Sequence, residues 1–230
     1  DIWAAAAMGD AERVSSRLAA NPSLVSAMGP NNAPPLHFAA TPKVVDILLG
    51  AGADPGVRDK YKQIAIERIA SYGARRQAAG KRLMAVMRLR DVFLSCALGD
   101  LDEVKKALNA EPALVRARKA DALTASVLPN GVDAAGEMLL HIASRLGHEE
   151  IVRTLIEHGA DVNARAGGGI APMHIAAGGG HTGVVGLLLD NGGDIDAVED
   201  LHRSTPLGWA RFQRRDETQR LLKARGARAD

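Results

Sequence analysis

The sequence is poor in cysteine and in aromatic residues. Cys96 is the one cysteine among 230 residues, so an intramolecular disulfide is excluded and nothing points to an oxidising compartment. Aromatic residues make up only 3% of the chain, whereas hydrophobic residues make up 47%. The core must therefore be built from aliphatic side chains and alanine. Such a core suits helices packed closely side by side, and we interpret Cys96 as part of it.

The sequence also lacks an excess of charge and any long apolar run. It has 29 Lys and Arg against 27 Asp and Glu, and the resulting formal charge of +2 is too small to indicate a phosphate-binding protein. No apolar run has the length of a membrane span, and no signal peptide is recognisable. We therefore expect no membrane association and take the cytoplasm as the default location. The chain starts at Asp1 rather than Met, so a missing targeting segment stays open.

What the sequence does contain is an internal repeat between residues 133 and 197. Leu140-His141 recurs 33 residues later as Met173-His174, and Gly147-His148 recurs as Gly180-His181. The segment 159–164 recurs in the same way as 192–197. A period of this length is typical of repeat proteins, in which each unit buries its apolar face against the next one.

The 33-residue period and its Pro-Leu-His-x-Ala-Ala core resemble the ankyrin repeat, a turn followed by two antiparallel helices. Residues 34–40 match this core with Pro-Pro-Leu-His-Phe-Ala-Ala, and residues 205–207 match its start with Thr-Pro-Leu. The resemblance implies an all-α ankyrin-repeat solenoid of about seven stacked helix-turn-helix units, with the first and last acting as caps. Gly159 and Gly192 would end second helices, and Pro172 and Pro206 would stand in the first turn of first helices.

A second symmetry extends the array to the N-terminus. Asp1-Ile2-Trp3 recurs 90 residues later as Asp91-Val92-Phe93, which fits three somewhat shortened units before the second copy. We expect one array over residues 1–230 with an insertion at 119–132. Whether this insertion forms part of a binding face or is a loop without a function stays open. The predicted units are 1–28, 29–58, 59–90, 91–118, 133–165, 166–199 and 200–230.

The family's inter-repeat polar network is expected to be incomplete here. In ankyrin repeats the Thr of the Thr-Pro-Leu-His core caps its helix and bonds to the His. No unit of this chain has both residues, because the pairs read Pro34/His37, Met138/His141, Ala171/His174 and Thr205/Gly208. Each missing cap is expected to cost about 1 kcal/mol of stability.

Catalysis and metal binding find little support in the sequence. The histidines recur with the structural period, and neither His-Glu-x-x-His nor a paired cysteine motif occurs. The glycine runs 167–169 and 178–180 lack the Gly-Lys-Ser/Thr context of a phosphate loop, and no Gly-x-Ser-x-Gly elbow is present. We therefore expect a protein that is not an enzyme, with no catalytic residue, cofactor or metal.

The resemblance implies that a partner protein binds to the turn tips and the exposed side of the first helices. By frame, the candidate contacts are Tyr61, Glu137, Arg145, Leu146, Ile170, Leu201, His202 and Phe212. The expected function is a protein-interaction scaffold, and we expect a monomer.

Two other interpretations stay open. The chain is alternatively a regulatory or targeting module of a larger multidomain protein, such as an enzyme. A less favoured interpretation is nucleic-acid or anionic-ligand binding by the basic C-terminal helices, where Asp216 and Glu217 interrupt the arginines and only Trp209 and Phe212 offer stacking surfaces.

Overall fold

The computed structural model describes residues 1–61, 63–72, 76–87, 92–117 and 137–228. The chain divides into two compact units, Asp1–Leu98 and Gly99–Asp230, and each is described by itself. The described ranges contain helices and no β-strand beyond an isolated bridge, which confirms the all-α prediction. The predicted insertion at 119–132 lies outside the described residues. The single continuous array over 1–230 stays a prediction.

The first unit starts with a complete pair of helices and continues with shortened ones. Helices α1 (Ile2–Met8) and α2 (Ala11–Ala20) match the pair predicted for the N-terminal unit. They are followed by the short 3-10 helices η1 (Pro22–Val25), η2 (Pro30–Asn32) and η3 (Pro35–Phe38), and then by α3 (Pro42–Gly50). The remaining helices are α4 (Ala65–Ala70), α5 (Gln77–Met87) and α6 (Val92–Ala97).

The predicted unit 29–58 is shorter than the 33-residue period, and its first helix is only the 3-10 helix η3. Only Ala39 and Ala40 separate it from Thr41, whose hydroxyl accepts a hydrogen bond from the Val44 amide at 3.4 Å and so caps α3. Pro42 stands in the first turn of α3, where the missing amide hydrogen costs nothing. Leu36, Val45 and Leu48 are fully buried, so the short element still contributes to the core.

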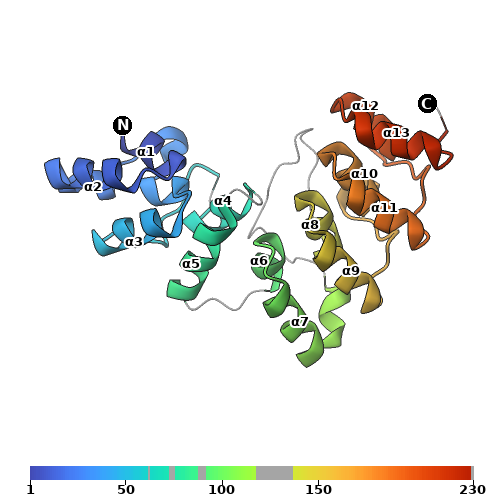
Figure 1. Ribbon diagram of the computed structural model, residues 1–230, viewed down its shortest axis with the longest axis horizontal. Helices are drawn as coiled ribbons and strands as arrows, with labels where there is room; N and C mark the ends of the chain where they lie inside the picture. Colours follow the sequence, from blue (N-terminus) through green and yellow to red (C-terminus); the bar gives the residue numbers. More distant parts are fainter. Residues whose placement is uncertain (62, 73–75, 88–91, 118–136, 229–230) are drawn as a thin grey trace. The chain divides into compact units, whose positions relative to one another are not determined.

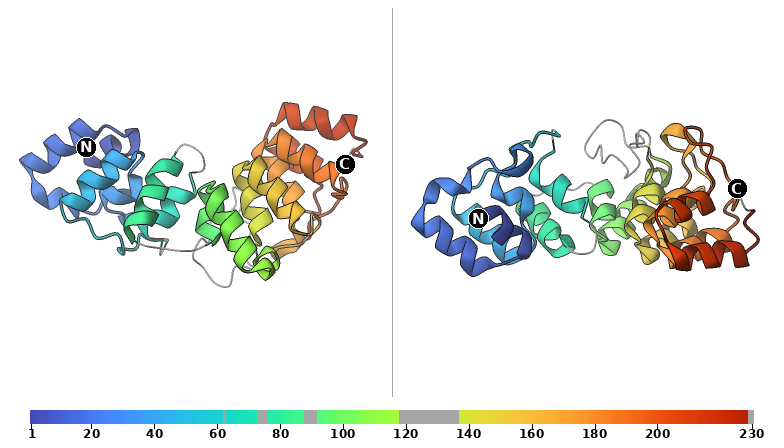
Figure 2. Two further views of the ribbon diagram at one scale, coloured as in Figure 1. Left: turned by 60° about the horizontal axis from the view of Figure 1, so that its bottom comes forward. Right: turned by 90° about the horizontal axis from the view of Figure 1, so that it is seen from above.

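The second unit is more regular. After α7 (Leu101–Ala110) and η5 (Pro112–Arg116), three helix pairs follow one another. They are α8 (Leu139–Leu146) with α9 (Glu149–Glu157), α10 (Pro172–Gly179) with α11 (Thr182–Asp190), and α12 (Pro206–Phe212) with α13 (Asp216–Ala224). The 3-10 turn η6 (Gly167–Gly169) precedes α10, and Figures 1 and 2 show the pairs succeeding one another in chain order.

The first and second helices of this unit form two layers. In one layer α10 packs between α8 and α12, and in the other α11 packs between α9 and α13. Ala143, Ala176 and Ala210 are fully buried, so the first helices approach closely, while Leu155 and Leu188 fill the space below them. Each pair thus buries its apolar face against its neighbour, as the repeat predicts.

A hydrogen bond of histidine recurs in several repeats. The Nε2 atoms of His37, His141 and His174 lie 3.0, 3.1 and 2.9 Å from the carbonyl oxygens of Gln63, Ile170 and Ala197. Gln63 and Ile170 lie in the turn of the following unit, and Ala197 lies near the end of the unit that contains His174. All three imidazoles are fully buried. At these three histidines the polar network is therefore present, while Gly208 replaces the histidine in the last unit.

Candidate functional site

The predicted contact residues divide into an exposed and a buried group. Tyr61, Leu201 and Phe212 are 55%, 62% and 74% exposed, and they are among the most exposed large hydrophobic side chains of the described ranges. His202 is also exposed, whereas Arg145 and Leu146 are half-buried. Ile170 and Glu137 are buried, so neither side chain belongs to an accessible surface.

Ile170 was expected at the surface because it precedes a first helix, but its side chain points into the core. It is 1% exposed and clusters with Ile175 and Trp209. Its carbonyl oxygen also lies 3.1 Å from Nε2 of His141. The residue therefore joins two repeats, and the prediction of a partner contact is corrected at this position.

Glu137 was expected at a turn tip, and its carboxylate is instead enclosed. Its side chain is 1% exposed and its Oε2 lies 3.4 Å from a guanidinium nitrogen of Arg145, whose side chain is 15% exposed. A buried carboxylate requires such a partner because desolvation of a lone charge is costly. Glu137 and Arg145 thus form a structural pair, and Glu137 is removed from the candidate surface.

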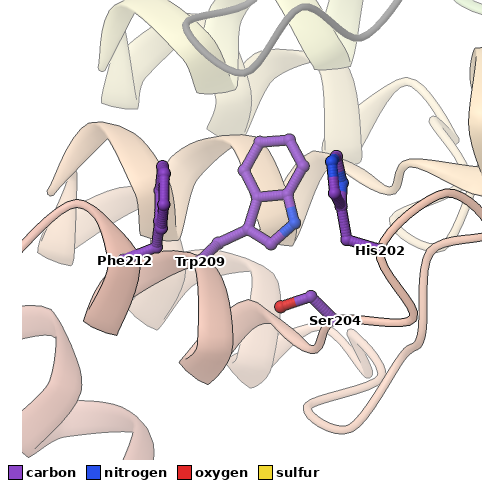
Figure 3. A pocket seen from close by; sticks show the side chains of 4 residues that line it. All are labelled: His202, Ser204, Trp209 and Phe212. Atoms are coloured by element: carbon purple, nitrogen blue, oxygen red, sulfur yellow. The ribbon is translucent and has the colours of Figure 1, made fainter.

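Two of the exposed candidate residues of the second unit, His202 and Phe212, line one pocket. His202, Ser204, Trp209 and Phe212 line a hollow of about 140 Å³, hereafter the C-terminal pocket. Figure 3 shows the rings of Phe212 and His202 on either side of the Trp209 indole, with the Ser204 hydroxyl near its base. Trp209 and Phe212 are three residues apart on α12, so they lie on the same face of that helix.

The loop before α12 is organised by a buried carboxylate. Glu199 is fully buried, and its oxygens accept hydrogen bonds from the backbone amides of Leu201, His202 and Ser204 at 2.7, 2.9 and 3.2 Å. Burial raises the pKa of the Glu199 carboxyl, but the amides of His202, Ser204 and Leu201 outweigh burial and hold that pKa below its usual value. The ionised carboxylate therefore fixes the loop that presents His202 and Ser204.

Trp209 is held rigidly at the floor of the C-terminal pocket. Its side chain is 5% exposed, and its ring meets that of His174 edge to face with centroids 5.9 Å apart. Gly178 of α10 provides the space, because a Cβ added there would lie 3.0 Å from the indole. Phe212, by contrast, has little contact with the core. The pocket thus combines a fixed aromatic floor with an exposed aromatic wall.

Tyr61 occupies a comparable turn in the first unit. The carboxylate of Asp59 accepts hydrogen bonds from the amides of Tyr61 and Gln63 at 2.8 and 3.0 Å and pairs with Arg68 at 2.8 Å. The ammonium of Lys60 lies 4.9 Å from the centroid of the Tyr61 ring. Tyr61 is therefore an exposed aromatic side chain on a turn whose backbone is held in place.

Sequence reasoning identified His202 and Phe212 but missed the organisation around them. Glu199 gives no signal in the sequence, because an acidic turn residue is ordinarily exposed. Trp209 was noted only as an aromatic residue of the basic C-terminal helices. The spacing between Trp209 and Phe212 was the available signal, since residues three apart in a helix share a face.

The described residues contain no group of three or more His, Cys, Asp or Glu side chains arranged to hold a metal ion. No helix within these ranges combines the length and apolar character that crossing a membrane requires.

Comparisons with known proteins agree with the geometry. A family model described as ankyrin repeats (many copies) matches residues 140–202, and a model of the single ankyrin repeat matches residues 31–60. The chain is similar to the NF-kappa-B inhibitor cactus of Drosophila melanogaster, with 30% identity over 124 residues, which is 53% of this chain and 22% of that protein. Cactus of Drosophila yakuba is 29% identical over 131 residues, 56% of this chain and 24% of that protein. The matched region thus spans about a quarter of the length of these relatives.

Proposed function

Because this chain is an ankyrin-repeat protein with an all-α solenoid fold, we propose that it is a non-catalytic module that binds another protein through the turns and first helices of its repeats. The C-terminal pocket is the observation that carries this proposal. It brings together the predicted contacts His202 and Phe212 on a preorganised loop and helix, beside the exposed Leu201. Exposed aromatic and aliphatic side chains on a rigid support are typical anchors of protein interfaces.

Tyr61 supports a second contact point on the first unit, because it lies on the corresponding turn and is 55% exposed. Arg145 and Leu146 are half-buried at the end of α8 and offer edge contacts rather than anchors. We therefore propose a separate contact point on each unit: Tyr61 on the first unit, and Leu201, His202 and Phe212 on the second.

The similarity to cactus supports recognition over catalysis, since both relatives are named as inhibitors. A role as the regulatory or targeting part of a larger protein is the second candidate. It is favoured by the short share of the relatives that the match covers, about a quarter of their length.

The proposal is tested by isolating partners from the source organism with the wild-type chain and with a Leu201→Ala/Phe212→Ala double variant. We expect proteins retained by the wild type to be lost from the variant by about tenfold or more, as for the loss of an interface anchor. Val86→Ala is the matched control, because Val86 is an exposed hydrophobic residue (44%) on the second helix α5.

Equal retention of the same proteins by the wild type and the double variant would contradict this assignment. Thermal melts of all three proteins exclude unfolding as the cause of a loss, and we expect them to coincide because the substituted side chains contribute little to the core.

A further inference from the structure

Within the second unit the positive charge is concentrated in the last repeat, whereas in the first unit it lies in residues 59–90, with nine Lys and Arg against two Asp and Glu. Residues 200–228 contain eight Lys and Arg against three Asp and Glu, a formal charge of +5, whereas the whole chain carries +2. The remainder of the chain is therefore net acidic. Arg225 and Arg228 are paired with Asp190 and Asp196 of the preceding repeat. The arginines next to pocket residues in the sequence differ from these two.

Arg203 and Arg214 flank the pocket in the sequence, and both are exposed. Arg203 stands between His202 and Ser204, and Arg214 follows Phe212 by two residues. No ion pair of either guanidinium occurs within the described part of the chain. Their charges are thus available to a ligand that approaches the C-terminal pocket.

Both arginines also adopt an unusual backbone conformation, with φ of 55°. Arg214 occupies the position between first and second helix that glycine holds in the other complete pairs, at Gly147 and Gly180 with φ of 73° and 80°. A left-handed conformation is unfavourable for arginine and costless for glycine. At Gly147 and Gly180 an added Cβ would also meet a side chain of the following repeat, His181 or Arg215.

The dimensions of the C-terminal pocket suit one apolar side chain. Its volume of about 140 Å³ is close to that of cavities of about 150 Å³ that accept benzene in other proteins. Trp209 and Phe212 supply apolar walls, and the Ser204 hydroxyl and the His202 ring supply polar groups at the rim.

We propose that the C-terminal pocket binds one large apolar side chain of an acidic peptide segment, whose carboxylates face Arg203 and Arg214. This inference rests on the proposed function and names the class of partner. Charge complementarity carries it, because an ionic attraction adds to the burial of the anchor. A cationic ligand is disfavoured by the same arginines, and the carboxylate of Glu199 is already occupied by backbone amides.

A single-stranded nucleic acid is disfavoured by the geometry. Stacking of successive bases requires several exposed rings along a groove. In the last repeat Trp209 is 5% exposed, so the open rings are limited to those of Phe212 and His202. Asp216 and Glu217 also begin α13 and interrupt the basic residues.

The fluorescence of Trp209 reports peptide binding to the C-terminal pocket. The chain has two tryptophans, so a Trp3→Phe background leaves Trp209 as the single indole reporter. The probe is a nonapeptide of Glu and Asp with a central Leu, titrated at low salt while the Trp209 emission is recorded. The matched peptides replace the central Leu by Ala, or all acidic residues by Lys. We expect the acidic Leu peptide to bind at least about fivefold more tightly than either, and more weakly as salt is raised.

Two variants and one control locate the site. Phe212→Ala and Arg214→Gly are each expected to weaken binding of the acidic Leu peptide by about fivefold or more. Arg214→Gly is expected to have a melting temperature at least as high as the parent, so its loss of binding is not a loss of folding. Lys223→Ala removes the same charge from the second helix α13 and is expected to leave binding unchanged.

Three outcomes overturn the inference. The first is equal binding of the Leu and Ala peptides. The second is preference for the Lys peptide, or for a peptide with trimethyl-lysine added as a further probe. The third is tighter binding of a single-stranded oligonucleotide, used as a competitor, than of the acidic Leu peptide. Loss of binding in Lys223→Ala equal to that in Arg214→Gly would likewise oppose it. If the acidic peptide fails while partner isolation still depends on Leu201 and Phe212, the inference is wrong and the proposed function stands.

Discussion

At the scale of single residues, buried imidazoles join one repeat to the next. In His141 and His174 the Nδ1 atom accepts a hydrogen bond from the backbone amide three residues earlier, at 3.4 and 3.2 Å. The Nε2–H therefore donates to the carbonyl oxygen of Ile170 or Ala197, which assigns the neutral tautomer. Residue 34 is proline and has no amide hydrogen, so Nδ1 of His37 lacks this partner among the described residues. A protonated imidazole would lose the acceptor on which this arrangement depends.

These histidines predict an acid-sensitive fold. Desolvation lowers the pKa of His174 to about 4 from 6.5, and burial also lowers the pKa of His37 and of His181. The unfolded chain takes up protons near pH 6.5 while the folded chain does not, so stability is complete above that pH and falls as the pH is lowered towards 4. The expected loss from His174 is on the order of 3 kcal/mol, measured by urea unfolding at a series of pH values.

The assignment to His174 is checked by following the imidazole carbon-bound proton signals in NMR spectra of the folded protein. The His174 signal should keep its neutral position at pH 5.5. A midpoint near 6.5 would rule out this source of acid sensitivity.

At the scale of elements, the helix starts differ in how their first amides are satisfied. Thr205 caps α12, and its hydroxyl accepts a hydrogen bond from the Gly208 amide at 3.1 Å. The starts of α8 and α10, at Met138 and Ala171, have no side-chain cap. Histidine in the first turn compensates in part by accepting the amide of the N-cap residue itself.

The caps predict a pair of opposite changes in stability. Thr205→Ala removes a hydroxyl acceptor and is expected to lower the free energy of unfolding by about 1 kcal/mol. Ala171→Thr adds the hydroxyl at the equivalent position and is expected to raise it by a similar amount. Chemical denaturation of both variants measures the effect, with Thr205→Ser as the control that retains the cap. A loss in Thr205→Ser as large as that in Thr205→Ala would show that packing of the methyl group, and not the cap, matters here.

At the scale of the whole chain, the two compact units differ in regularity. In Asp1–Leu98 two first helices are reduced to the four residues of η3 and the six of α4, whereas α8 and α10 of the second unit each have eight residues. The stability of a repeat protein is the sum of the stabilities of its units and of the contacts between neighbouring units. A region with shortened helices is therefore expected to unfold before the others.

This difference predicts unequal unfolding of the two units. Trp3 lies in the first unit and Trp209 in the second, so each reports on one. We expect the Trp209 emission, recorded in Trp3→Phe, to change at a higher urea concentration than the total emission of the wild type. Coincident transitions by fluorescence and by circular dichroism would instead indicate that the whole array unfolds as one cooperative system.

The sequence by itself determined the repeat architecture, because its 33-residue period and its Pro-Leu-His-x-Ala-Ala core resemble the ankyrin repeat, whose units bury their apolar faces against one another. It also sufficed to place Tyr61, Leu201 and Phe212 on exposed turns and helix ends. Only the tertiary structure decided that Ile170 and Glu137 are buried, since the direction of a turn side chain depends on the neighbouring repeat. The C-terminal pocket likewise required the structure, because Glu199 fixes its loop and Gly178 makes room for Trp209 through contacts between residues distant in the sequence.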